Sequence, residues 1–130
     1  MKHALKISQS SQAANVLRDY MSGLDHEEMW GLFLNRDNRL ISKEMLTKGT
    51  LTYTPIDART IIKHSLLKNA TGVIIIHNHP SGNPSPSQRD IEETQKVSKA
   101  CKLMDIALLD HIIISKHSYY SFADETTIEY

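Results

Sequence analysis

The sequence has few of the residues that mark several common classes of protein. It contains one cysteine, Cys101, so no disulfide can form within the chain. Fifteen Lys and Arg residues balance fifteen Asp and Glu residues, which gives a formal net charge of zero. A neutral chain has no strong electrostatic field that favours nucleic acid or an anionic membrane. We therefore expect neither a disulfide-rich scaffold nor a strongly basic nucleic-acid binder, and we expect a reducing, cytoplasmic location.

Long apolar runs are also missing. No purely apolar run is longer than that at residues 73–76, which is far shorter than the roughly 20 residues that a membrane-spanning helix needs. Residues 1–9 have no apolar stretch of signal-peptide length, so we expect a soluble protein with no membrane partner. The 130 residues, 40% of them hydrophobic, fit one globular domain that buries a core without disulfide or metal staples. A metal site in this chain would serve chemistry rather than folding.

The hydrophobic pattern predicts a fold of the α+β class. Residues with a helical period of apolar positions lie at 11–22, from Asp57 onward and at about 88–104. Strand patterns lie at 29–34, from Leu40 onward, and at 73–76, 106–114 and 119–122, with a hairpin turn near 36–38. This order predicts a mixed β-sheet with flanking helices. The first helix, within 1–23, would belong to or pack on the domain formed by 24–130.

The residues that carry chemistry lie between 77 and 90, directly after the strand predicted at 73–76. His77 and His79 are two residues apart, so in extended backbone their rings lie on one side and can share a metal such as zinc. A loop of prolines and glycine then leads to Asp90 in the first turn of the next helix. Two imidazoles and one carboxylate leave a fourth tetrahedral position for water, as hydrolytic zinc sites require. The pattern predicts one zinc ion held by His77, His79 and Asp90.

A hydrolytic metal site also needs a general base and a donor for the developing oxyanion. The sequence offers Glu27 and Glu28 as the base, and Ser87 as the donor. A plainer interpretation exists, because Ser87 and Asp90 also fit a helix capping box and histidines at a strand end are often only polar residues. The histidines, the turn residues, the serine and the aspartate lie within fourteen residues of each other, and this coincidence favours the metal site.

The same residues resemble a known motif. The pattern His-x-His, seven residues, Ser, two residues, Asp resembles the JAMM (MPN-plus) metalloprotease motif. The fuller string at 77–82, with Pro86, Ser87 and Asp90, resembles the RadC family. The resemblance covers about residues 25–125 and continues through further stretches, which are 32–35, 39–41, 49–50, 69–70, 109–113 and 120–122.

The resemblance implies a JAB1/MPN fold, which is cytidine-deaminase-like, with one zinc ion held by His77, His79 and Asp90. It implies that Ser87 supports the transition state and that a glutamate upstream is the general base. The register of RadC sequences gives Glu27, whereas the Glu-x-x-Gly spacing of deubiquitinating relatives gives Glu28. Successive strand residues face opposite ways, so only one of the two can point inward, and we favour Glu27.

The activity implied is zinc-dependent hydrolysis of an amide bond, in a peptide or an isopeptide, with a DNA-repair association carried by the family. The alternatives are a non-catalytic MPN scaffold for protein interaction and a metal-dependent nucleic-acid-processing factor. The sequence names neither the protein or peptide substrate nor the oligomeric state, because a metal site shows how a bond is broken and the surrounding groove decides which one.

Four further residues lie outside the proposed ligand set. Asp110 and His111 are neighbours in a predicted strand and face opposite sides, so one of them could orient a metal-binding histidine, or the pair could be plain strand polarity. Both interpretations stay open. Cys101 lies on the apolar face of its helix and is expected in the core, and His26 is expected at the surface.

Overall fold

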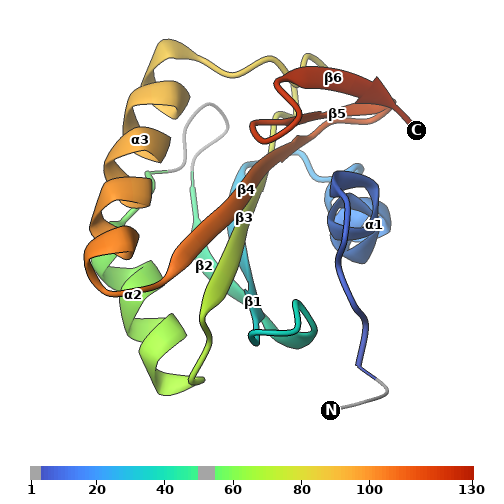
Figure 1. Cartoon of the computed structure of the whole chain (residues 1–130). Coiled ribbons are helices and arrows are strands. Elements are labelled where there is room, and N and C mark those ends of the chain that lie inside the picture. Colours follow the sequence, from blue (N-terminus) through green and yellow to red (C-terminus); the bar gives the residue numbers. More distant parts are fainter. Residues whose placement is uncertain (1–3, 50–54) are drawn as a thin grey trace.

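A computed structural model describes residues 4–49 and 55–130 of the chain. Thr50, part of the stretch 49–50 named above, lies outside the described residues. The described residues form three helices and six strands (Figure 1), which in chain order are α1 (Ser10–Met21), β1 (Glu28–Leu34), β2 (Leu40–Lys48), α2 (Ala58–Leu67), β3 (Gly72–Asn78), α3 (Gln88–Leu103), β4 (Ala107–Ile114), β5 (Ser118–Ser121) and β6 (Thr126–Glu129). No helix in these parts of the chain is long and apolar enough to cross a membrane.

The six strands form one mixed sheet in the order β2-β1-β3-β4-β5-β6. β3 and β4 are parallel, and every other neighbouring pair is antiparallel. Parallel neighbours need a crossover connection, and α3 provides it between β3 and β4. Helix α1 covers one face of the sheet, while α2 and α3 cover the other (Figure 1). The predicted α+β architecture, a mixed sheet with flanking helices, is confirmed.

The alternation of side chains along β1 and β3 divides the interior into two cores. Ile74 and Ile76 face α1, whereas Val73 and Ile75 face α2 and α3. In these two strands even-numbered residues therefore point to α1 and odd-numbered residues to α3. All of β3 is buried, as expected for a strand covered on both faces. The same alternation decides on which face each polar residue near the strand ends lies.

Two helices begin at residues whose side chains cap them. The carboxylate of Asp57 accepts a hydrogen bond from the backbone N–H of Arg59 (2.9 Å) at the start of α2. At the start of α3, Ser87 and Asp90 form a capping box, in which each side chain accepts the backbone N–H of the other. The box fixes the backbone at Asp90, and its position matters for the site below.

One element was not predicted. The strand expected last, at 119–122, is present as β5, but β6 follows it and pairs with it antiparallel. β6 is four residues long, and only Ile128 among them is partly covered. Its sequence therefore shows no alternation of apolar and polar residues, which is the signal by which strands are recognised.

Candidate metal centre

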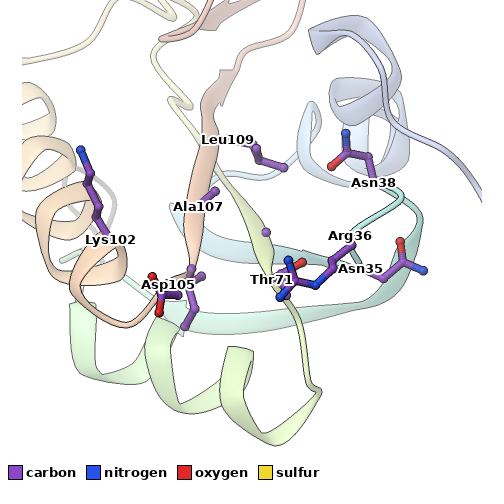
Figure 2. A pocket seen from close by; sticks show the side chains of 10 residues that line it. Asn35, Arg36, Asn38, Thr71, Lys102, Asp105, Ala107 and Leu109 are labelled. Atoms are coloured by element: carbon purple, nitrogen blue, oxygen red, sulfur yellow. The ribbon is translucent and has the colours of Figure 1, made fainter.

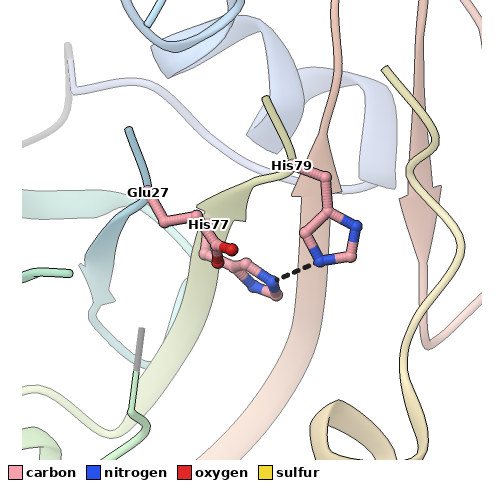
Figure 3. Close-up of side chains that lie close together, drawn as sticks. All are labelled: Glu27, His77 and His79. Atoms are coloured by element: carbon pink, nitrogen blue, oxygen red, sulfur yellow. Dashed lines mark hydrogen bonds between the residues drawn. The ribbon is translucent and has the colours of Figure 1, made fainter. Parts of the chain in front are cut away.

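Two histidine rings converge where β3 ends. His77 is an odd-numbered residue of β3, so its ring points to the α3 side, where it is 1% exposed. His79 follows the strand, and its backbone N–H donates to the carbonyl of Ile114 on β4 (2.9 Å), which holds it close to the sheet. The Nε2 atoms of the two rings are 3.1 Å apart (Figure 3). The two rings therefore face the same space.

The carboxylate of Asp90 reaches the same point from the first turn of α3. Its Oδ1 is 3.7 Å from His77 Nε2, and its Oδ2 is 3.3 Å from His79 Nε2. The side chain is 11% exposed. The loop between β3 and α3 thus brings together the three groups that the sequence proposed as ligands.

The chemistry and spacing of these groups fit a divalent metal. Ligand atoms about 2.0–2.1 Å from a tetrahedral zinc ion lie about 3.3 Å from each other, and the observed separations run from 3.1 to 3.7 Å. His79 Nδ1 lies 2.9 Å from the carbonyl oxygen of Asn83 and must donate to it, so in the neutral ring Nε2 presents a lone pair. Two imidazole nitrogens and a carboxylate form a donor set that zinc accepts.

Glu27 lies beside the two histidines. Its carboxylate and the two rings form a group whose ligand atoms all lie within 4.8 Å of one another, and Figure 3 shows it next to His77. Asn78 holds this segment in place: its side chain accepts the backbone N–H of Glu28 (2.8 Å) and donates to the carbonyl of His26 (2.9 Å). The residue between the two histidines therefore fastens the backbone that carries Glu27 to the end of β3.

Glu28, the other candidate base, points to the opposite face of the sheet. Its carboxylate accepts hydrogen bonds from the Tyr20 hydroxyl (2.9 Å), the His26 ring (2.7 Å) and the Trp30 indole N–H (2.9 Å). His26, expected at the surface, is therefore only partly exposed. The structure separates the adjacent glutamates, with Glu27 near His77 and Glu28 near α1.

Ser87 caps the start of α3, and its side chain is exposed to solvent. Its Oγ accepts the backbone N–H of Asp90 (3.0 Å), and its own backbone N–H donates to the Asp90 carboxylate (2.9 Å). The side chain is exposed, and the bond that it accepts leaves its hydroxyl proton able to donate. The capping interpretation and a role in supporting an oxyanion are therefore compatible.

Comparison with known proteins finds one family along nearly the whole chain. The model of the RadC-like JAB domain matches residues 7–127. The chain belongs to the RadC-like JAB domain family. It is 45% identical over 120 residues to a UPF0758 protein of Flavobacterium johnsoniae, covering 92% of this chain and 52% of that protein. It is 43% identical over 116 residues to UPF0758 protein YfjY of Escherichia coli K12, covering 88% of this chain and 72% of that protein.

Relatives at lower identity agree. A UPF0758 protein of Porphyromonas gingivalis is 41% identical over 120 residues, which are 92% of this chain and 53% of the relative. The chain therefore spans about half the length of two of these three relatives.

Burial and charge shift the pKa values of this RadC-like JAB site. Burial, the largest cause, raises the pKa of Glu27, Asp90 raises it further, and His79 opposes both. Burial disfavours the charged form of Asp90, but the nearby His79 and His77 rings and the Ser87 N–H together hold the pKa of its carboxyl well below the usual range. For His79, burial works to lower the pKa, yet Asp90, Asn83 and Glu27 outweigh it and raise the pKa. These shifts favour a negatively charged Asp90 carboxylate and a positively charged group beside it.

Three residues near the site were missed or left open by the sequence. His111 contacts His77 from β4, and Asp110 faces away to Ser121 and Ala123, so their opposite orientation is as predicted. Thr94 contacts the His111 ring and was not singled out (2.6 Å). It lies four residues after Asp90 on α3, so helical spacing could have placed both on one face.

A separate cavity of the RadC-like JAB domain lies away from the two histidines. A cavity of about 660 Å³ is lined by the hairpin turn between β1 and β2 and by the starting ends of β3 and β4 (Figure 2). Arg36, Thr71, Lys102 and Asp105 are among its lining residues. Its described lining includes none of the predicted site residues, and the histidines stand at the other end of β3. Cavity size alone does not locate the site in this fold.

Proposed function

We propose that this domain is a zinc-dependent hydrolase of the JAMM type that cleaves an amide bond, in a peptide or an isopeptide. One observation carries the proposal: His77 Nε2, His79 Nε2 and the Asp90 carboxylate converge at separations of 3.1 to 3.7 Å. The Glu27 carboxylate lies beside them, as a general base must. We assign His77, His79 and Asp90 as ligands and Glu27 as the base.

The chain's own residues have separate tasks in such a reaction. A bound zinc ion supplies a Lewis acid and lowers the pKa of a coordinated water from about 15.7 to about 7. Glu27 takes a proton from the attacking water, whose oxygen forms the new C–O bond. It then passes that proton to the amine nitrogen as the C–N bond breaks. Burial raises the pKa of the Glu27 carboxyl group, and this makes the group a stronger proton acceptor than an exposed glutamate. The Ser87 hydroxyl donates a hydrogen bond to the oxygen that gains negative charge.

The burial of these groups favours a catalytic role over a purely structural one. His77, Asp90 and Glu27 are all buried, and buried ionisable groups without full compensation destabilise a fold. A domain that served only as an interaction scaffold would gain stability by replacing them with apolar residues. Their presence together at one point of this chain is the argument against the scaffold alternative.

The substrate is open to direct test. Purified protein is expected to bind about one equivalent of zinc and to cleave a member of a panel of peptides and isopeptide-linked peptides, with loss on chelation and recovery on adding zinc. Oligonucleotides in the same panel test the nucleic-acid alternative, which takes precedence if they alone are cleaved. Zinc binding without any cleavage would favour the scaffold, and failure to bind zinc or another transition metal would overturn the proposal. The DNA-repair association and the cytoplasmic location stay predictions.

A further inference from the structure

A line of buried hydrogen bonds leads away from the metal site into α3. His77 Nδ1 lies 2.7 Å from His111 Nε2, and His111 Nδ1 lies 2.6 Å from the Thr94 hydroxyl. Thr94 Oγ1 in turn lies 2.5 Å from the carbonyl oxygen of Asp90. His77 is 1% exposed, His111 is 0% and Thr94 is 8%. The line therefore joins one proposed ligand, His77, to the backbone of another, Asp90, through groups that water barely reaches.

The direction of every hydrogen bond in this line follows from its two ends. A carbonyl oxygen only accepts, so at 2.5 Å the hydroxyl proton of Thr94 must lie between Thr94 Oγ1 and Asp90 O. A hydroxyl has one proton, and Thr94 therefore offers His111 only a lone pair. His111 Nδ1 must carry a proton and donate it to Thr94.

The same reasoning carries on to His77. With its proton on Nδ1, the neutral His111 ring presents a lone pair at Nε2, so His77 Nδ1 must carry the proton between the two rings. His77 Nε2 then bears a lone pair, and this is the atom that lies 3.1 Å from His79 and 3.7 Å from Asp90. These protons are assigned from the network of heavy atoms. The hydroxyl on α3 thus decides which nitrogen of His77 is able to bind a metal.

The His111 ring is also held in its plane. Phe122 stacks on it with ring centroids 4.7 Å apart and planes at 4°. The backbone N–H of Phe122 donates to the carbonyl of His111 (3.0 Å). The parallel pairing of β3 and β4 places Ile75 opposite His111 in the strand register, and Ile75 is the residue of β3 before His77 on the same face. The ring therefore cannot turn to exchange its two nitrogens without breaking packed contacts.

We propose that Thr94 and His111 are positioning residues that hold His77 in the tautomer with its proton on Nδ1, and so keep His77 Nε2 as a ready zinc ligand. This inference rests on the proposed function, in which His77 binds the metal. Residues that orient a metal-binding imidazole typically change metal affinity by about 10–100-fold when they are replaced. We therefore expect Thr94 and His111 to affect zinc affinity although neither of them is a zinc ligand.

The test compares zinc affinity in three variants, measured by competition with a chelator. Thr94→Val keeps the shape but removes the hydroxyl, and we expect zinc to bind about 10-fold or more weakly. Thr94→Ser restores the hydroxyl and is expected to return the affinity to near that of the wild type. Ser65→Ala is the matched control, because Ser65 is a buried helical hydroxyl that also donates to the carbonyl four residues earlier (2.8 Å) and has no hydrogen bond to an imidazole ring among the described residues.

A second readout follows the proton itself. In nitrogen-15 NMR spectra of the protein kept free of metal, His77 should carry its proton on Nδ1 in the wild type and in Thr94→Ser, and should shift toward Nε2 in Thr94→Val. Thermal unfolding checks that each variant is folded. Unchanged zinc affinity in folded Thr94→Val, or a wild-type His77 protonated on Nε2, would overturn the inference. If the wild type binds no zinc, the proposed function fails, and the NMR result still decides whether the line orients His77.

Discussion

Two buried polar clusters lie on opposite faces of the sheet, at the same end of β1 and β3, and they are built in opposite ways. Around Glu28, the donors Tyr20, His26 and Trp30 all point at one carboxylate. Around His77 and His79, the acceptors gather instead, with two imidazole nitrogens facing each other and two carboxylates nearby. The first cluster is complete with the chain's own protons, whereas the second gathers acceptors of the kind that a cation binds. The comparison teaches that adjacent glutamates can have opposite surroundings, because Glu28 is surrounded by donors and Glu27 lies beside two imidazole rings.

The largest effect should come from removing a ligand. His77→Ala deletes one of two imidazoles from the acceptor cluster, so we expect loss of zinc binding and of all zinc-dependent hydrolysis. Metal content by elemental analysis and cleavage of the responsive substrate measure the two losses. The matched change on the other face is His26→Ala, which should leave the zinc content at that of the wild type. Loss of zinc in both variants would show that the two clusters are not independent.

The second largest effect should be a difference in activity between variants of Glu27 and Glu28. Glu27→Gln removes a base but no assigned ligand, so activity should fall by about 10²–10⁴-fold while zinc stays bound. Glu28→Gln should retain activity within a few-fold, because its carboxylate faces α1. Steady-state cleavage rates on the same substrate give both values. A greater loss of activity in Glu28→Gln than in Glu27→Gln would reverse the assignment of the base.

For the free energy of unfolding we expect the opposite order, with a larger loss in Glu28→Gln than in Glu27→Gln. In Glu28→Gln an amide replaces an oxygen that accepts hydrogen bonds, so its N–H₂ group faces donors. Leaving buried partners unsatisfied costs about 1–3 kcal/mol, and we expect the free energy of unfolding in urea to fall by that amount. Glu27→Gln should unfold at or above the wild-type midpoint, since it removes a charge that burial disfavours. Equal loss of stability in both variants would contradict the division into a structural and a chemical cluster.

The smallest effect is a pH dependence in the Glu28 cluster. Hydrogen bonds to Asp25 and Glu28 raise the pKa of His26 in the folded state. A raised pKa means that the protonated ring stabilises the fold fully below the unfolded pKa of about 6.5, and that this stabilisation is lost as pH rises through the higher folded value. The stability difference between wild type and His26→Gln should therefore shrink above pH about 6.5. Urea unfolding across a pH series measures it, and a constant difference would show that the ring's charge is not involved.

Local patterns in the sequence predicted most of the fold. The helix starts at Asp57 and Ser87, the hairpin near 36–38 and the buried strand at 73–76 were each encoded within a few neighbouring residues, and all are present. β6 was missed because it is only four residues long and its sequence does not alternate between apolar and polar residues. It exists because β5 offers it an edge to pair with, which no local pattern reveals.

The sequence by itself determined that His77 and His79 share one side, that Asp90 begins a helix and that Glu27 and Glu28 face opposite ways, because spacing in strands and helices fixes direction. Only the tertiary structure decided that the side of Glu27 is the side of His77, since this depends on how β1 is paired with β3 and on which face α3 packs. It alone brought His111 beside His77, through the register of two parallel strands. Direction is a local property of the backbone, whereas proximity is set by packing between distant segments.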